Sequence, residues 1–283
     1  MRGLSILHEH LRRGGAVPAF VIYNLETAQA VVAAAERCGR AVLLQAGASA
    51  FKHAGREPLA RMAVQLAMAA DVPIGVHLDH SRSLQEVRAC LELGYTSVMI
   101  DGSHLPYREN VALTQEAVAQ AHQFGAWAEA ELAAIAGDED RSTNAVAEVM
   151  TDPQVAADFV AATGVDALAV AVGNVHGYTE MPPDIDFARL DALRQSTGVP
   201  LVLHGGSGLS PHVLRRCIEL GVVKVNINTE LRRAYLDGVT DALPGSLESW
   251  DLAGLLGAGR AAASETAVRL IKLMADGPVQ SRA

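Results

Sequence analysis

The sequence predicts an α/β protein, a (β/α)8 TIM barrel with a C-terminal helical tail, and three observations carry this prediction. Eight short apolar runs alternate with segments of helical periodicity. Several of these helical segments end in a glycine just before the next apolar run, which is typical of the turn from a helix into a strand. Polar residues gather where the apolar runs end, and the carboxyl ends of barrel strands are where such folds build their sites.

Each expected element follows from this alternation. The strands are predicted at Val17–Ile22, Ala41–Gln45, Ile74–Leu78, Ser97–Ile100, Ala126–Leu132, Ala167–Ala171, Leu201–Leu203 and Val223–Val225. The helices are predicted at Leu25–Cys38, Leu59–Ala70, Leu84–Leu93, Asn110–Phe124, Gln154–Thr163, Phe187–Gln195, Pro211–Leu220 and Glu230–Asp241. Near-continuous apolar strands separated by helices indicate a parallel sheet covered by helices. A doubly wound open sheet would instead carry a Gly-x-Gly-x-x-Gly turn after the first strand, where Tyr23-Asn24-Leu25-Glu26 stands.

The chain is expected to form one barrel domain over residues 1–283, with 242–283 as a helical extension. That extension begins with a Pro-Gly break at Pro244-Gly245 and continues as a helix from Arg260 to Met274. One connection, Ala133 to Asp152 after the fifth strand, is long and rich in acidic and small residues. A loop of that length in a compact domain is typical of a lid over a site.

The composition limits the classes of binding partner and the cellular compartment that we expect. The chain has 23 Lys and Arg against 32 Asp and Glu, a formal charge of -9, and no basic stripe, which argues against nucleic acid and anionic membranes as partners. Three cysteines are scattered without a Cys-x-x-Cys pair, as in proteins whose thiols stay reduced. No stretch is long and apolar enough to cross a membrane, and no apolar signal region opens the chain. We therefore expect a soluble cytoplasmic protein that acts on a small molecule.

Three histidines follow three different predicted strands. His80, His176 and His204 should meet at one end of the barrel, and three imidazoles that leave an open position are typical of a catalytic zinc site. Asp101 and Glu131 are expected to support those ligands or to bind a second metal. The alternative is that His176 and His204 only satisfy loop backbone groups.

A glycine-rich turn, Gly205-Gly206-Ser207-Gly208, follows the seventh strand, and Thr229 begins a helix after the eighth. Backbone amides in such a turn and at such a helix start can hold an anion, and the loops after strands seven and eight are the usual phosphate seat of these barrels. A merely tight turn is the alternative. The neighbouring Asn226 and Asn228 favour the phosphate interpretation.

Taken jointly, these motifs resemble a known family, the class II zinc-dependent ketose-bisphosphate aldolases, in particular their tagatose and fructose bisphosphate branch. The likeness extends to about Asp241. The matching segments are Asn24-Leu25-Glu26-Thr27, His77-Leu78-Asp79-His80, Met99-Ile100-Asp101-Gly102-Ser103, Glu129-Ala130-Glu131-Leu132, Gly137-Asp138-Glu139-Asp140, Leu168-Ala169-Val170-Ala171, His176-Gly177, Leu203-His204-Gly205-Gly206-Ser207-Gly208 and Lys224-Val225-Asn226-Ile227-Asn228-Thr229-Glu230.

The resemblance implies roles for individual residues. His80, His176 and His204 match the Zn2+ ligands, and Asp79 matches the residue that exchanges a proton with the oxygen of the aldehyde half. Glu139 matches the acid/base that exchanges the proton on the dihydroxyacetone phosphate carbon. Further matches to positions that hold the ketose phosphate and a monovalent cation (Na+ or K+) are Gly177, Gly205, Ser207, Asn226, Asn228 and Thr229, with Asn24 and Ser49 matching less closely. The resemblance also implies a homodimer or homotetramer. His77 is expected to be a structural support.

The chain departs from the family pattern at several positions. Val21 stands where the family often has Asn, and Ala133 and Ala136 stand where it often has Gly. No lysine follows the strand-six histidine, and Arg260 and Arg269 are unaligned candidates for the arginine that binds the distal phosphate. Aldolase chemistry is therefore expected, with the substrate either a ketose bisphosphate, a ketose phosphate without the second phosphate, or a sugar-acid phosphate.

Three rival functions remain open from the sequence. A Schiff-base aldolase would need a lysine at a strand end, for which Lys224 is the candidate. A zinc hydrolase would use the same histidines. A non-catalytic phosphosugar-binding protein would keep the fold and lose turnover.

Overall fold

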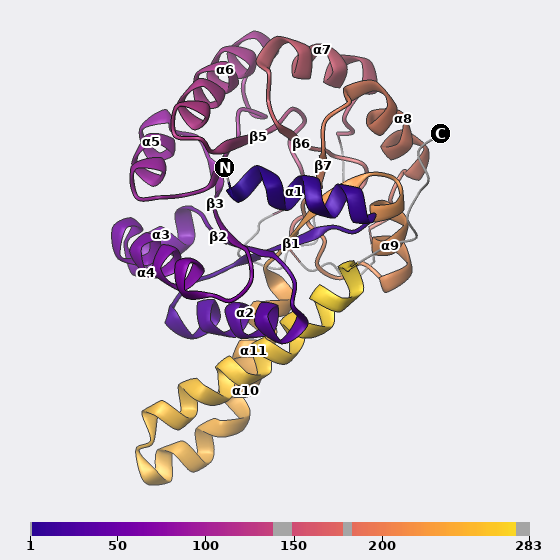
Figure 1. Cartoon of the computed structure of the whole chain (residues 1–283). Coiled ribbons are helices and arrows are strands. Elements are labelled where there is room, and N and C mark those ends of the chain that lie inside the picture. The colour runs from indigo at the N-terminus through magenta and orange to yellow at the C-terminus, as the bar shows by residue number, and fades with distance from the viewer. Residues whose placement is uncertain (1, 138–148, 178–182, 276–283) are drawn as a thin grey trace.

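Eight parallel strands close into a barrel in which each strand pairs with the next and β8 pairs with β1 (Figure 1). The computed structural model describes residues 2–137, 149–177 and 183–275. The strands are β1 (Val17–Val21), β2 (Val42–Ala46), β3 (Ile74–Ser81), β4 (Ser97–Ile100), β5 (Trp127–Glu131), β6 (Ala167–Ala169), β7 (Leu201–Leu203) and β8 (Val222–Ile227). The helices are α1 (Arg2–Arg13), α2 (Leu25–Cys38), α3 (Ala48–Ala54), α4 (Arg56–Ala69), α5 (Leu84–Glu92), α6 (Tyr107–Gln123), α7 (Pro153–Thr163), α8 (Phe187–Thr197), α9 (Pro211–Glu219), α10 (Thr229–Ser249) and α11 (Leu252–Met274). The predicted (β/α)8 barrel with C-terminal helices is confirmed.

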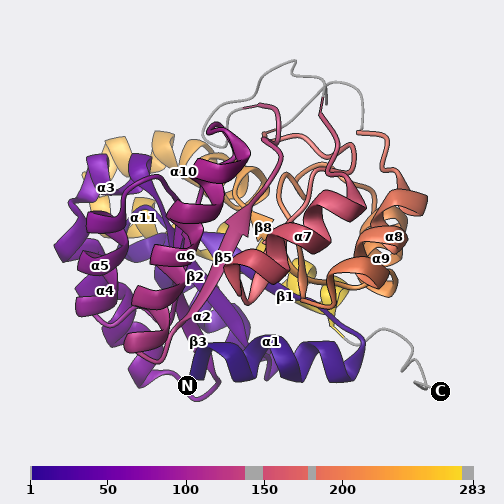
Figure 2. The same ribbon diagram turned by 90° about the horizontal axis from the view of Figure 1, so that it is seen from above.

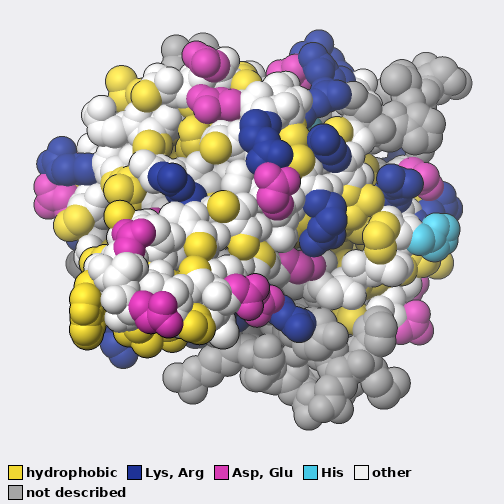
Figure 3. Space-filling model, turned by 90° about the horizontal axis from the view of Figure 1, so that it is seen from below, with side chains coloured by type: hydrophobic (Ala, Val, Ile, Leu, Met, Phe, Trp, Pro, Cys, Tyr) yellow, Lys and Arg dark blue, Asp and Glu magenta, His cyan; other side chains and the backbone are white. Residues whose placement is uncertain are grey.

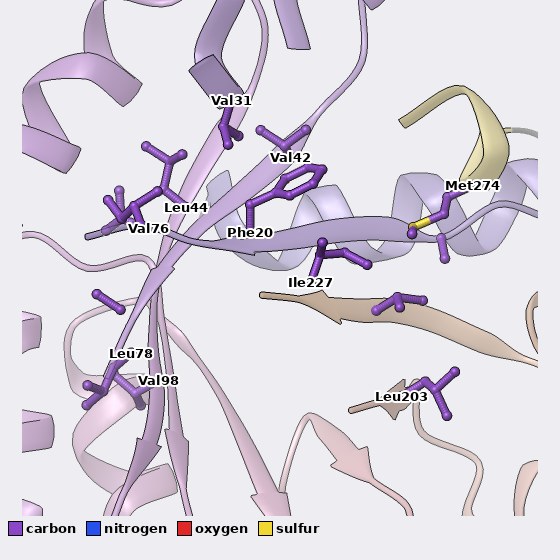
Figure 4. Packing of buried hydrophobic residues seen from close by; sticks show 14 of the residues in the cluster. Phe20, Val31, Val42, Leu44, Val76, Leu78, Val98, Leu203, Ile227 and Met274 are labelled. Carbon is purple, nitrogen blue, oxygen red and sulfur yellow. The ribbon is translucent and has the colours of Figure 1, made fainter. Parts of the chain in front are cut away.

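The main hydrophobic layer lies between the strands and the surrounding helices. Phe20 of β1 and Val42 of β2 lie beside Val31 of α2 in this layer, and all three are buried (Figure 4). Burying one such side chain contributes about 1.5–3 kcal/mol. This layer is why the strands are apolar on the face that points outward from the barrel.

A second, smaller cluster fills the interior of the barrel, and α1 covers it from one end. Ile6 and Leu7 of α1 are buried with Leu43, Met99 and Trp127 from three strands. Figure 2 shows α1 lying across the end where the strands begin. A helix before the first strand was not predicted, nor was the short α3. Because α1 closes the amino ends of the strands, a substrate must approach from their carboxyl ends.

The C-terminal tail differs from the prediction. The break expected at Pro244-Gly245 is wrong, because α10 continues through Pro244 to Ser249 and the chain turns at Trp250, in the left-handed region. The next helix, α11, begins at Leu252 rather than Arg260. The two helices pack on each other and project from the barrel (Figure 1). A Cβ at Gly238 would lie 2.8 Å from Ala258 O, so this glycine permits a close approach, and tertiary packing of this kind overrides the local effect of a proline.

Side chains of different types are mixed on one face of the barrel. On the face shown in Figure 3, basic, acidic and hydrophobic side chains are interspersed among the described residues. Within the described ranges, no helix has the length and hydropathy needed to cross a membrane.

Candidate active site

The end of β3 brings Asp79 and His80 to the barrel rim in an irregular backbone. The pairing of β3 with β4 shifts between Leu78 and Ser81, and His80 has a φ of 43°. A non-glycine residue in this left-handed region costs about 1–3 kcal/mol, and such strain occurs mainly at functional sites. Regular alternation would turn Asp79 and His80 to opposite faces. A register shift re-aims a side chain, so that both groups can serve one site.

The three predicted histidines do meet. His204 Nδ1 lies 2.7 Å from His80 Nε2, and the His176 ring centroid lies 5.0 Å from that of His80 and 5.6 Å from that of His204. Together with Glu131 they form a group whose ligand atoms all lie within 4.8 Å of one another. Burial, followed by the neighbouring His80, lowers the pKa of His204 to about 3, so its ring is neutral and able to bind a metal.

The two predicted acidic residues differ in protonation. Glu131 is buried, and its Oε2 has no hydrogen-bond partner among the residues that the structure describes. Burial, helped by Asp101, raises the pKa of Glu131 to about 7. Burial alone would raise the pKa of Asp101 too, but hydrogen bonds with His80 and Ser103 hold it well below its usual range. An orphaned carboxylate oxygen beside three imidazoles is what a bound cation would satisfy, so the donor set fits a metal ion.

Beneath the histidines lies a buried ion pair between Glu129, to which the sequence assigned no role, and Lys224, which was considered only as a Schiff-base lysine. Glu129 Oε1 lies 2.8 Å from His204 Nε2, and Glu129 Oε2 lies 2.9 Å from Lys224 Nζ. His77 lies nearby, with Nε2 3.7 Å from Glu129 Oε2 and Nδ1 2.8 Å from Ser97 Oγ. Burial opposes the charge on Glu129, but the Lys224 ammonium and the His204 hydrogen bond hold its pKa well below its usual range. The carboxylate is therefore ionised and orients the ring of His204.

Asp79 is held by two amide side chains. Gln45 Nε2 donates to Asp79 Oδ2 at 3.1 Å, and Asn226 Nδ2 donates to Asp79 Oδ1 at 3.1 Å. Gln45 lies on β2 and Asn226 on β8, the two strands on either side of β1. Asp79 is only 3% exposed. These contacts aim a buried carboxylate at the same rim as the histidines.

The predicted phosphate and cation residues surround one small pocket. Its lining residues are His176, Gly177, Gly205, Ser207, Asn226, Asn228 and Thr229. Tyr23 donates a hydrogen bond from its hydroxyl to Asn228 Oδ1 at 3.1 Å. Thr229 is the first residue of α10, so the start of a helix, where amides lack partners within the helix, lines this pocket. A single pocket therefore contains six of the residues that the resemblance matched to the ketose phosphate and cation, whereas Asn24 and Ser49 do not line it.

Gly205 is required by its surroundings. Its φ is 59°, and an added Cβ would lie 2.1 Å from Val175 O. Gly39 has nearly the same φ, 60°, with nothing within 4 Å of an added Cβ. Comparing substitutions at Gly39 and Gly205 therefore distinguishes the free-energy cost of a left-handed backbone from that of a steric clash.

We expect Gly205→Ala to destabilise the protein far more than Gly39→Ala. The Gly39→Ala variant should lose about 1–2 kcal/mol from left-handed strain alone. The Gly205→Ala variant should lose at least about 3 kcal/mol, because the Val175 carbonyl must also move. Urea unfolding measures both values. Equal losses would show that the turn tolerates a side chain.

The remaining predicted residues lie at the edge of the site or outside the described residues. Asn24 caps α2, and its Oδ1 accepts hydrogen bonds from the Thr27 amide and hydroxyl. Ser49 lies in the first turn of α3, two residues after Gly47, where an added Cβ would lie 2.8 Å from Asp79 O. Glu139 lies outside the described residues.

A larger cavity of about 520 Å³ opens beside the histidines. Its lining includes His80, His176, Asp101, Glu131 and Gly137. Gly137 forms an isolated parallel bridge with His176, and the His176 amide donates to Ala136 O at 2.8 Å. Ala136, which stands where the family often has Gly, therefore contacts His176, one of the predicted metal ligands. This cavity is large enough for a small sugar substrate.

A closed parallel barrel with buried imidazoles and carboxylates at the carboxyl ends of its strands defines a barrel enzyme with a cluster that can hold a metal. The family model for class II fructose-bisphosphate aldolase matches residues 2–277. The chain belongs to this family, whose members are carbon-carbon lyases.

Solved structures agree with this assignment. The YdjI aldolase from Escherichia coli K12 is 33% identical, with a TM-score of 0.86 and coverage of 98% of each chain. A proposed fructose-1,6-bisphosphate aldolase from Coccidioides immitis is also 33% identical, with a TM-score of 0.87 and coverage of 96% of each chain. The fructose-bisphosphate aldolase from Campylobacter jejuni is 21% identical, with a TM-score of 0.81 and coverage of 95% of this chain and 93% of the other, and supports the fold alone.

Proposed function

We propose that the protein is a Zn2+-dependent aldolase that makes or cleaves the bond between dihydroxyacetone phosphate and an aldehyde. The observation that carries this proposal is the convergence of His80, His176 and His204 beside Asp79, an acidic group held by amides at the same rim. Membership of the class II aldolase family supports the reaction type. Imidazole and carboxylate ligands suit Zn2+.

Different residues are assigned to metal binding and to each of the two proton transfers. His80, His176 and His204 would hold the ion, which supplies Lewis-acid stabilisation of the negative charge that develops when the bond next to a ketone breaks. Asp79 exchanges a proton with the oxygen of the aldehyde half. Glu139, outside the described residues, is assigned the proton on the dihydroxyacetone phosphate carbon by resemblance.

The glycine-lined pocket is proposed to bind the phosphate of the ketose half. Its glycines let backbone amides approach an anion, and the start of α10 adds favourable partial charge. Asn226, Asn228 and Thr229 supply polar side chains there and are proposed to share the site with a monovalent cation. Ser49 and Asn24 are assigned outer contacts with the substrate.

The aldehyde partner can be a phosphorylated, neutral or carboxylated sugar fragment. A panel of such aldehydes, each offered with dihydroxyacetone phosphate, identifies it by the highest kcat/KM. A preference for aldehydes without phosphate would favour a ketose phosphate or sugar-acid phosphate over a bisphosphate.

Removing the metal should abolish cleavage reversibly. Dialysis against a chelator is expected to lower kcat by at least about 10²-fold, because losing a single group that stabilises the developing charge already costs about 10²- to 10³-fold. Adding Zn2+ should restore the rate. A coupled dehydrogenase assay measures cleavage, and full activity in the chelated protein would contradict the proposal.

The structure disfavours the Schiff-base alternative. Lys224 is fully buried, and its Nζ contacts the Glu129 carboxylate at 2.9 Å and donates to Asn226 Oδ1 at 2.7 Å. A nucleophilic amine must instead be neutral and accessible. Borohydride added with substrate should therefore leave activity unchanged. A non-catalytic phosphosugar-binding role predicts bound ligand without turnover, so the cleavage assay distinguishes it as well.

The same proposal includes the remaining expectations for the chain. Residues 1–283 are assigned to one barrel domain with 242–283 as its helical extension, and the protein is assigned to the cytoplasm as a homodimer or homotetramer. Light scattering of the purified protein measures the oligomer directly.

A further inference from the structure

Five buried side chains link the metal cluster to Asp79 beneath the floor of the site. His204 Nε2 lies 2.8 Å from Glu129 Oε1, and Glu129 Oε2 lies 2.9 Å from Lys224 Nζ. Lys224 Nζ then donates to Asn226 Oδ1 at 2.7 Å, and Asn226 Nδ2 donates to Asp79 Oδ1 at 3.1 Å. None of the five side chains is more than 4% exposed.

Each contact in this chain fixes the orientation of the next group. A carboxylate only accepts hydrogen bonds, so Glu129 requires the proton of His204 on Nε2 and leaves Nδ1 facing His80 and the metal cluster. An ammonium only donates, so Lys224 requires the oxygen of the Asn226 amide and turns its NH2 group toward Asp79. A flipped Asn226 would place its oxygen against the Asp79 carboxylate.

We infer that Glu129 and Lys224 are positioning residues that orient the metal ligand His204 and the proton carrier Asp79 together. Glu129 sets the ring of His204, and Lys224 sets the amide that holds Asp79. The part that concerns Asp79 rests on the proposed function, whereas the part that concerns His204 rests on the geometry of the metal cluster alone.

Glu129 and Lys224 carry opposite charges, and each neutralises the buried charge of the other. A buried carboxylate or ammonium left without a partner is strongly destabilising, whereas replacing both by neutral groups of similar size is often neutral for stability. The test therefore uses Glu129→Gln and the double variant Glu129→Gln/Lys224→Met. In the single variant Lys224 still donates to Asn226, and in the double variant it does not.

Two readouts separate the two roles. Affinity for Co2+ and Zn2+, measured by competition with a chromophoric chelator, should fall about 10- to 100-fold in both variants, because partners that support metal ligands have effects of this size. The Co2+ absorption spectrum should shift in both. At saturating metal, the ratio of ketose phosphate cleavage to hydrogen exchange on dihydroxyacetone phosphate should stay near wild type in Glu129→Gln and fall about tenfold in the double variant.

A matched pair on the surface supplies the control. Arg37 and Glu265 form an exposed ion pair at 2.6 Å, and Arg37→Met/Glu265→Gln makes the corresponding changes there. That variant should keep wild-type metal affinity and ratio. A folded double variant at Glu129 and Lys224 with unchanged metal affinity and unchanged ratio would overturn the inference. If the wild-type protein binds metal but cleaves no ketose phosphate, the proposed function fails, while the affinity series still decides the role of Glu129.

Discussion

The His204→Ala variant is expected to lose bound metal and cleavage activity together. His204 is fully buried, its Nδ1 lies 2.7 Å from His80 Nε2, and its Nε2 is held by Glu129. Alanine removes one of three imidazoles and leaves Glu129 without that contact. Cleavage should fall by at least about 10²-fold, because losing a group that stabilises transition-state charge costs about 10²- to 10³-fold. Metal analysis after dialysis and the coupled cleavage assay measure the two losses.

His212→Ala is the matched control, since His212 is an exposed histidine on α9. It should keep full metal content and full activity. Circular dichroism shows whether each variant is folded. A folded His204→Ala protein that retains one equivalent of metal would remove His204 from the ligand set.

The fold and the meeting of the three histidines were predictable because both follow from periodicity and topology. Alternating apolar runs and helices indicate a parallel barrel, and every parallel strand ends at the same rim. Residues as far apart in sequence as His80 and His204 are therefore neighbours once the strands are counted. The meeting of the predicted phosphate residues in one pocket followed from the same reasoning, because Gly205 and Thr229 come two residues after the ends of β7 and β8.

Other features depend on geometry that residue types do not specify. The left-handed backbone of His80 arises from a register shift between two strands, which no local pattern announces. Gln45 and Lys224 are polar residues within apolar strands. Their partners, Asp79 on β3 and Glu129 on β5, become apparent only when the strands are assembled into the barrel. The sequence offered one signal for the contact between Lys224 and Asn226: they are two residues apart on one strand, so their side chains lie on the same face. The helix break predicted at Pro244 was wrong because contacts between α10 and α11 outweigh the tendency of proline to end a helix.

The Asp79→Asn variant is expected to stop carbon-carbon cleavage while sparing hydrogen exchange on dihydroxyacetone phosphate. Asparagine keeps the shape of the side chain but cannot exchange the proton with the aldehyde oxygen. Removing a general acid-base group costs about 10²- to 10⁴-fold, so cleavage should fall by that amount. The exchange reaction belongs to the ketone half and does not use Asp79. Metal content should stay at the wild-type value, because Asp79 lies outside the cluster of His80, Glu131, His176 and His204.

Asp71→Asn, an exposed carboxylate replaced in the same way, is the control and should leave both rates unchanged. Isotope exchange followed by NMR and the coupled cleavage assay give the two rates on one protein sample. Parallel loss of exchange and cleavage in Asp79→Asn would mean that the residue shapes the whole site through Gln45 and Asn226. Loss of cleavage alone requires that Asp79 handles the proton of the aldehyde half, because the metal ligands and the phosphate pocket must then still bind and activate the ketone half.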